Sequence, residues 1–168
     1  LIKIKTKIKK FNKVLSIDGD KSISIRWALI ASQSEFKSKS DNLLLSEDVI
    51  NTLKCLKKLG VKIKISKNFC EINGVGLNGF KYKKNLTLNA GNSGTLGRLI
   101  MGLLTHTKLS IRLKGDKSLS KRDFLRIIRP LKKFPKNLPL TVTNSKLPKS
   151  AEVSFTHLET VPLAVEFS

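Results

Sequence analysis

Two short stretches of the sequence combine residue types that hold anions. GDKSISIR occupies positions 19–26, GDKSLSKR occupies positions 115–122, and six of the eight positions are identical. Each stretch brings a lysine, two serines and an arginine together, follows an apolar strand-like run and precedes a helix-like one. A turn that leads from a strand into a helix directs free backbone N–H groups at a ligand. The pattern predicts binding of phosphate or carboxylate groups.

A third stretch of this kind lies between the two copies. LNAGNSGTLGR, at positions 88–98, joins a strand-like start to a turn rich in glycine, asparagine and serine that opens a helix. Gly91 and Gly94 permit backbone conformations closed to other residues, or the close approach of a ligand. One such turn alone is typical of a capped, solvated helix end. We hypothesise that the three turns meet in space, with their polar side chains forming one site: Lys21, Ser22, Ser24, Arg26; Asn92, Ser93, Thr95, Arg98; Lys117, Ser118, Ser120, Lys121, Arg122.

The elements that must position these turns follow from hydrophobic periodicity. Strand patterns occupy residues 2–9, 14–17, 61–66, 69–75, 88–90 and 109–113. Helix patterns occupy residues 22–34, 46–60, 94–104 and 121–134. Ser46 is placed to cap the second helix, Gly60 to end it, and Pro130 to end or kink the last one. The alternation predicts an α/β (α+β) fold with several helices beginning on one side, irregular after about residue 135.

The net charge of +21 would suit a protein that binds nucleic acid. However, lysine outnumbers arginine by 27 to 6, and nucleic-acid surfaces favour arginine for its bidentate contacts. Only 6% of the residues are aromatic, and they are not interleaved with basic residues to form a stacking platform. We therefore expect solvated lysine-rich faces and no nucleic acid as a partner.

Composition also disfavours membrane, disulfide and metal proteins. The longest apolar run, residues 99–104, is too short to cross a bilayer, so no membrane association is expected. Cys55 and Cys70 are unclustered, which indicates two buried thiols in a reducing cytoplasm. His106 and His157 are isolated in sequence, so we expect no metal site and no cofactor.

Four motifs, in family order, resemble the amino-terminal portion of 5-enolpyruvylshikimate-3-phosphate synthases. They are GDKSISIR, SEDVINTLKCLKKLGV, NAGNSGTLGRLIMGLL and GDKSLSKRDFLRIIRPLKKF, which span roughly residues 10–134. The resemblance implies transfer of the enolpyruvyl group of phosphoenolpyruvate to the 5-hydroxyl of shikimate 3-phosphate, in aromatic amino acid biosynthesis. It also implies an inside-out α/β barrel built of repeated βαβαββ units, of which this chain is most of one of two domains.

The resemblance assigns roles to residues of the three turns. Lys21 matches the catalytic lysine that contacts both substrates, and Ser22, Arg26 and Ser150 match residues that bind shikimate 3-phosphate. The residues matched to phosphoenolpyruvate binding, besides Lys21, are Asn92, Gly94, Arg98 and Arg122. Fixed positive charge and N–H donors suit two polyanionic substrates.

The sequence departs from the family pattern at three places. Ile25 stands where a polar residue, often histidine, is common, and Asp123 replaces a common proline. Glu152 stands where the family has a glutamine that contacts substrate, and its charge would repel anions.

The family is more than twice as long as this chain, and its second half supplies the acidic proton-transfer residues. We therefore expect a fragment that is inactive alone, from an enzyme that is monomeric at full length. Residues 1–17 would form a strand belonging to the other domain, and residues 18–168 a partial enolpyruvyl transferase domain.

Two alternatives stay open. The first is the sister enzyme that acts on UDP-N-acetylglucosamine, whose motif has asparagine after the lysine, where this chain has Ser22 together with Arg26. The second is a non-enzymatic basic module that binds a polyanion. The similarity of the two octapeptides is explained equally by an internal repeat of the fold and by chance.

Overall fold

The computed structural model describes residues 12, 14, 16–67, 69–107, 110–131 and 140–142. Its elements, in chain order, are α1 (Lys21–Gln33), β1 (Lys37–Ser40), α2 (Glu47–Lys58), β2 (Lys62–Ser66), β3 (Phe69–Asn73), β4 (Leu86–Asn89), α3 (Gly94–Leu103), the 3-10 helix η1 (Leu104–His106), β5 (Ile111–Lys114), α4 (Lys117–Ser120), α5 (Leu125–Leu131) and β6 (Leu140–Val142).

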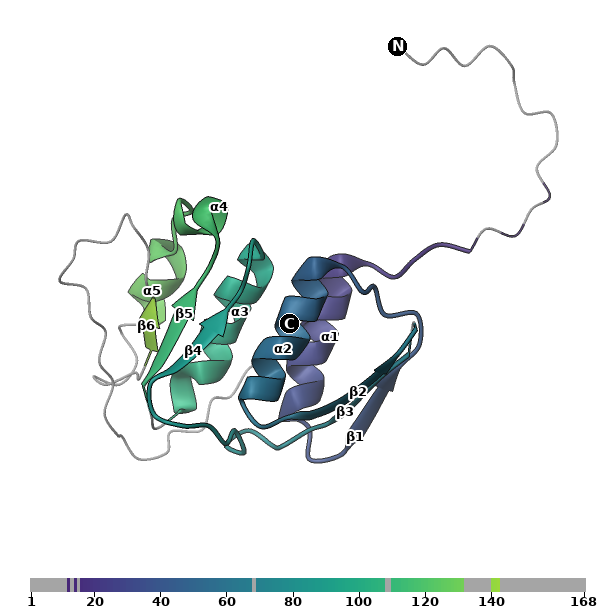
Figure 1. Ribbon diagram of the computed structural model, residues 1–168, viewed down its shortest axis with the longest axis horizontal. Helices are drawn as coiled ribbons and strands as arrows, with labels where there is room; N and C mark the ends of the chain where they lie inside the picture. Colours follow the sequence, from purple (N-terminus) through teal and green to yellow (C-terminus); the bar gives the residue numbers. More distant parts are fainter. Residues whose placement is uncertain are drawn as a thin grey trace, which may run out of the picture.

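The strands form two three-stranded sheets of different kinds. β1, β3 and β2 form an antiparallel sheet with β3 in the centre, in which Ile72 lies opposite both Ser38 and Ile63. β4, β5 and β6 form a parallel sheet with β5 in the centre, in which Leu88 lies opposite Leu113. Helices α1, α2 and α3 lie between the two sheets (Figure 1). The structure therefore confirms an α/β architecture whose helices are on the inside.

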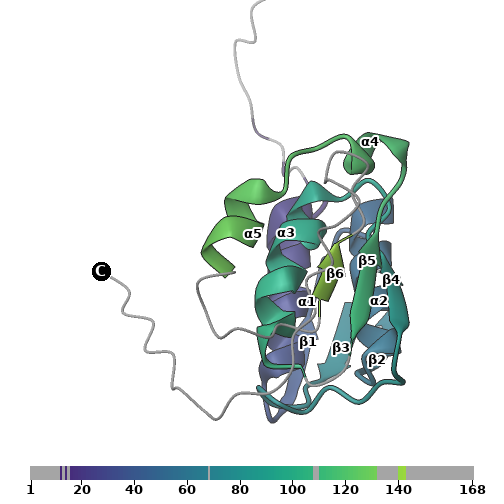
Figure 2. The same cartoon turned by 90° about the vertical axis from the view of Figure 1, so that its left-hand side faces the viewer.

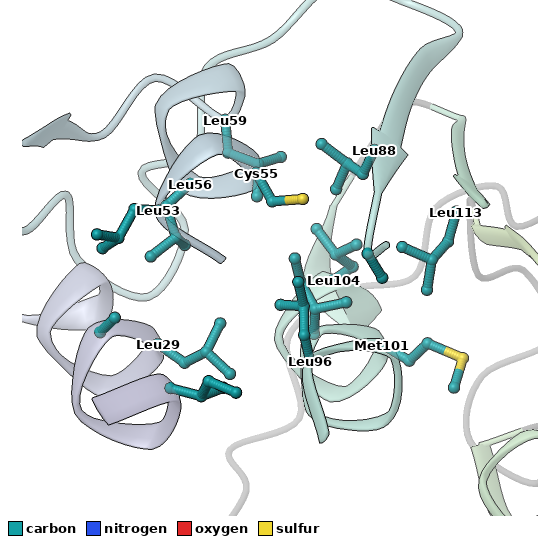
Figure 3. Close-up of a cluster of buried hydrophobic side chains, with 14 of the residues drawn as sticks. Leu29, Leu53, Cys55, Leu56, Leu59, Leu88, Leu96, Met101, Leu104 and Leu113 are labelled. Atoms are coloured by element: carbon teal, nitrogen blue, oxygen red, sulfur yellow. The ribbon is translucent and has the colours of Figure 1, made fainter. Parts of the chain in front are cut away.

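The core lies where the three helices meet the inner faces of both sheets (Figure 3). On α2 the predicted apolar stripe is buried at Val49, Leu53 and Leu56, because residues three and four apart share one face of a helix. On the strands, alternate side chains point inward, as the buried Cys70 and Ile72 of β3 show. Burying this apolar surface holds the helices at fixed positions relative to the sheets.

The parallel sheet places two of the three polar turns beside each other. The chain leaves β4 and β5 at the same edge because the two strands run in the same direction. Backbone bonds then join the turns: the Ala90 N–H donates to Lys114 O at 2.9 Å, and the Asp116 N–H donates to Gly91 O at 2.9 Å. Figures 1 and 2 show α3 and α4 beginning at this edge, together with α1 and α2. The prediction that helices begin on one side is confirmed.

Several predicted elements need correction. The strand at 14–17 is wrong for its described residues, since Val14, Ser16 and Ile17 lie outside the strands and Val14 is fully exposed. A strand needs a hydrogen-bonded neighbour, and the described residues offer this segment none. The helix predicted at 121–134 begins four residues later than expected, as α5 at Leu125, and the short helix α4 before it was not predicted. The predicted strand at 2–9 lies outside the described residues.

The cap predicted for α2 is only half right. Ser46 occupies the N-cap position, but its hydroxyl makes no capping bond and its buried Oγ has no hydrogen-bond partner among the described residues. Gly60 does follow the end of the helix, with a positive φ of 90°. Strands β1 and β6 were not predicted, because KSKS contains no apolar residue to mark a buried face and LTV is only three residues long. Within the described residues, no helix is long and apolar enough to cross a membrane.

We expect Cys55 and Cys70 to be unreactive in the folded protein. Both described thiols are free and buried, and burial raises the pKa of each from 9.0 to about 11. At pH 8 this makes the reactive thiolate about a hundredfold scarcer than in the unfolded chain. The protonated thiols therefore favour the folded state below pH 9, and this contribution is lost as the pH rises toward 11. A disulfide exchange reagent should label both cysteines in urea and neither in buffer; rapid labelling in buffer would contradict their burial.

Candidate active site

The two octapeptides build the same local structure. Asp20 caps α1, accepting a hydrogen bond from the Ile23 N–H at 2.7 Å, and Asp116 caps α4 in the same way, from the Leu119 N–H at 2.7 Å. In each copy the second serine also donates its N–H to the carbonyl of the capping aspartate, at 2.9 Å. Both stretches are therefore capped helix starts that present a lysine and a serine in their first turn.

Packing makes the two copies unequal. In the first copy Ile23 is exposed, whereas the equivalent Leu119 is buried and packs against Gly115. The first copy opens a helix of 13 residues and the second a helix of only four. Only α1 therefore has the length to carry a substantial helix dipole at its start.

The second and third turns meet around Gly94, as hypothesised. Arg122 reaches across from the third turn, and its Nη2 donates a hydrogen bond to Asn92 Oδ1 at 3.1 Å. A Cβ added to Gly94 would lie 2.7 Å from Arg122 Nη1 and 3.5 Å from Arg98 Nη1. The absence of a side chain at Gly94 thus lets two guanidinium groups converge on the start of α3. Arg98 also lies over the ring of Phe124, 6.0 Å from its centroid.

Helix α2 connects the first turn to the second. Lys21 Nζ lies 3.0 Å from Asp48 Oδ2, which joins the first turns of α1 and α2. One helical turn further along α2, the Asn51 amide nitrogen occupies the space where a side chain on Gly91 would lie. Gly91 has a positive φ of 58°, so this turn requires glycine for two reasons. Lys21 is therefore joined through α2 to the turn that carries Asn92 and Gly94.

Two predicted polar side chains, Ser24 and Ser93, and the apolar Ile25 have structural roles instead. The buried Ser24 Oγ accepts a hydrogen bond from the Leu44 N–H at 3.2 Å, which ties α1 to the segment before α2. The buried Ser93 Oγ caps α3, accepting from the Leu96 N–H at 3.2 Å. Ile25 is fully buried in the core, so the apolar residue at this position contributes to packing and is not part of the site surface.

The remaining predicted residues lie where they can contact a ligand or fall outside the described chain. Ser22 is half-buried and Arg26 is exposed on the same face of α1, with Arg26 Nη1 donating to Ser22 O at 3.1 Å. Lys117, Ser118 and Lys121 are exposed. Ser150 and Glu152, the two matches from the later segment, lie outside the described residues.

Sequence reasoning missed Asp48, Asn51 and Phe124 as members of the site. Asp48 lies in the first turn of α2, where a carboxylate suits the helix start, and the other two belong to ordinary amphipathic helix patterns. Their proximity to the turns arises only from the packing of α2 and of the segment just before α5. The described residues contain no group of three or more His, Cys, Asp or Glu side chains placed to hold a metal ion.

The arrangement is chemically suited to anions. Four cationic side chains, Lys21, Arg26, Arg98 and Arg122, lie on helices or turns at one edge of the molecule. Two of the carboxylates at this edge, Asp20 and Asp116, are occupied in capping backbone N–H groups. Positive charge and helix starts together favour ligands with phosphate and carboxylate groups.

The sequence is similar to proteins named 3-phosphoshikimate 1-carboxyvinyltransferase. The family model described as EPSP synthase (3-phosphoshikimate 1-carboxyvinyltransferase) matches residues 5–168. A 3-phosphoshikimate 1-carboxyvinyltransferase of Thermoanaerobacter sp. (strain X514) is 40% identical over 153 residues, covering 86% of this chain and 36% of the relative. One of Ruthia magnifica subsp. Calyptogena magnifica is 44% identical over 135 residues, covering 80% of this chain and 30% of the relative. The chain thus spans about a third of the length of these curated relatives.

Solved structures agree with the sequence matches. EPSP synthase from Acinetobacter baumannii superposes with a TM-score of 0.67 at 37% sequence identity, covering 71% of this chain and 27% of that one. The fold is therefore that of the enolpyruvyl transferases, as the resemblance of the four motifs implied. The chain belongs to the EPSP synthase (3-phosphoshikimate 1-carboxyvinyltransferase) family.

Proposed function

We propose that this chain binds shikimate 3-phosphate and phosphoenolpyruvate and supplies one wall of an enolpyruvyl transfer site. The observation that carries the proposal is the convergence of Arg122, Asn92 and Arg98 on the open space at Gly94. In that position the guanidinium groups can pair with the phosphate and carboxylate of phosphoenolpyruvate. Family membership supports the choice of these two substrates over other anions.

Shikimate 3-phosphate is proposed to bind along the start of α1. Ser22 can donate its hydroxyl and Arg26 its guanidinium from one face of the helix, and Lys21 lies between this face and α2. Lys21 is proposed to contact both substrates and to stabilise the negative charge that remains on the departing phosphate. By resemblance to the family, the first octapeptide contacts shikimate 3-phosphate, whereas the second contributes a single arginine to phosphoenolpyruvate binding. These different roles agree with the different packing of the two octapeptides in the structure.

Transfer itself requires proton donors and acceptors in addition to these cations. The resemblance assigns those acidic residues to a part of the family that this chain does not span, so we propose that the 168 residues bind substrate without turnover. Residues 1–17 are proposed to belong to the second domain of the complete fold. We further propose a cytoplasmic enzyme that uses no cofactor and is monomeric at full length.

Titration with shikimate 3-phosphate tests the proposal. Trp27, half-buried beside Arg26 on α1, should report binding as a saturable change in fluorescence. Arg26→Ala removes a charge-assisted contact worth about 1.5–3 kcal/mol, so the dissociation constant should rise about 10- to 150-fold. Arg112→Ala, which removes an exposed arginine from the outer face of β5, should leave it unchanged.

Three results would contradict the proposal. The first is no response of the parent chain at millimolar shikimate 3-phosphate. The second is tighter binding of UDP-N-acetylglucosamine, which would favour the sister enzyme despite Ser22 and Arg26. The third is binding of duplex DNA with a steep salt dependence that Arg122→Ala does not alter, which would favour a general polyanion-binding module.

A further inference from the structure

We infer that Asp48 is a positioning residue that holds the Lys21 ammonium group at the junction of the two proposed substrate positions. The inference rests on the proposed function, because that proposal is what gives Lys21 a role in substrate binding. Its physical basis is the 3.0 Å contact between Lys21 Nζ and Asp48 Oδ2 and the position of each residue on its helix.

Lys21 lies where a lysine is unfavourable for its own helix. It is the first residue of α1, where the unpaired N–H groups carry partial positive charge. The Asp20 carboxylate at the N-cap is engaged with the Ile23 N–H at 2.7 Å, and the first turn of α1, all of which the structure describes, contains no acidic residue that could pair with Lys21. A residue that opposes the local preference of its helix is expected at a functional position. The carboxylate that pairs with the Lys21 ammonium group comes from α2, through Asp48.

Asp48 differs from the other aspartates at this edge. Asp20 and Asp116 each accept a hydrogen bond from a backbone N–H of their own helix, and the Asp123 carboxylate does the same for the Leu125 N–H. Asp48 instead contacts the ammonium group of a lysine on a different helix, and its side chain is only 20% exposed. Its carboxylate is therefore directed at the one lysine to which the proposed function gives a role.

Stability alone does not account for this pair. The Lys21 side chain is 51% exposed, and ion pairs at such positions contribute about 0–1 kcal/mol. A carboxylate beside an anion site also has a cost, because it repels the ligand. Asp48 is thus useful to the site only if fixing the position of Lys21 outweighs that repulsion.

The direction in which Asp48→Asn changes the affinity for shikimate 3-phosphate therefore distinguishes the two effects. Removing a negative charge near an anion site should tighten binding if only net charge matters. If Asp48 positions Lys21, the same change should weaken binding of shikimate 3-phosphate about tenfold, within the range measured for residues in direct contact. Glu47→Gln is the matched control, because it removes the same charge from the same helical turn at an exposed residue. It should leave binding unchanged or slightly tighter.

A double-mutant cycle separates positioning from a general structural effect. In the Lys21→Ala background, Asp48→Asn should no longer weaken binding: the dissociation constant should stay unchanged or fall slightly, since the group that Asp48 holds is absent and only its repulsion of the ligand is removed. Weakening that persists in the Lys21→Ala background would overturn the inference. So would unchanged or tighter binding by the Asp48→Asn single variant.

A second readout keeps the inference separate from the proposed function. In lysine-selective ¹⁵N NMR spectra, the Lys21 ammonium signal, assigned by its loss in Lys21→Ala, should be sharp in the parent and in Glu47→Gln. It should broaden in Asp48→Asn, because a released ammonium group exchanges protons with water faster. If the parent chain fails to bind shikimate 3-phosphate, the proposed function fails, and this spectrum alone decides whether Asp48 holds Lys21. An unaltered Lys21 signal in Asp48→Asn would overturn the inference.

Discussion

Replacing Arg122 by alanine is expected to raise the dissociation constant for phosphoenolpyruvate about 10- to 100-fold, measured by calorimetry with shikimate 3-phosphate present. A guanidinium group pairs with phosphate or carboxylate through charge-assisted hydrogen bonds, each worth about 1.5–3 kcal/mol. Arg122 is already held before a ligand arrives, because its Nη2 donates to Asn92 Oδ1 at 3.1 Å. Little conformational freedom is therefore lost when it binds, which makes its removal costly.

The neighbouring lysine provides the control for this prediction. Lys121→Ala removes an exposed positive charge one residue away and should change the dissociation constant less than about twofold, because exposed charges are screened by salt. Equal increases of the dissociation constant in the two variants would contradict the prediction, because they would show that phosphoenolpyruvate binding depends only on the general positive charge of this edge. Neither substitution should lower the melting temperature, since both side chains lie at the surface.

Replacing Leu56 by alanine is expected to lower the free energy of unfolding by about 2–5 kcal/mol. Leu56 is fully buried on α2, within the cluster of buried hydrophobic side chains between the helices and the sheets (Figure 3). The substitution removes apolar contacts and leaves a cavity that the packed core fills only in part. Small domains are stabilised by about 5–15 kcal/mol in total, so this single change removes a large share.

Urea denaturation followed by circular dichroism measures the effect. Leu77→Ala is the matched control, because Leu77 is 74% exposed in a turn and should cost less than about 0.5 kcal/mol. Similar losses of unfolding free energy in the two variants would contradict the arrangement of α2 between the two sheets.

The helix starts were the most predictable part of the molecule. α1 begins at Lys21 and α2 at Glu47, each within one residue of the start expected from capping residues and periodicity. These signals are local, so they are readable in the sequence. The last helix was expected to begin at residue 121 but begins at Leu125, because residues 121–124 fit the amphipathic pattern yet form the connection between α4 and α5.

The strands that depend on distant partners were the least predictable. β1 is a run of alternating lysine and serine, and it becomes a strand because its residues pair with β3, as Ser38 does with Ile72. The apolar run ending at Ile17 has the composition of a strand, yet its described residues have no strand beside them. Strand formation here is decided by tertiary pairing, which composition does not record.

The candidate site was predicted in its residue types but not in its connections. Asn92, Arg98 and Arg122 were singled out, and the structure brings them together at Gly94. The links through α2 could not be predicted, because Asp48 reaches Lys21 only once α1 and α2 are packed side by side. Contacts between residues far apart in sequence are created by packing, and periodicity gives no sign of them.

The central claim is that three turns form a single site for shikimate 3-phosphate and phosphoenolpyruvate. The most direct test is to record ¹H–¹⁵N NMR spectra of the parent chain while both compounds are added. The account predicts saturable shifts concentrated in backbone amides of residues 20–26, 92–98 and 116–122. Shifts centred on the exposed lysines of the antiparallel sheet, at Lys37, Lys39, Lys62 and Lys64, or spread evenly over all basic surfaces, would contradict it.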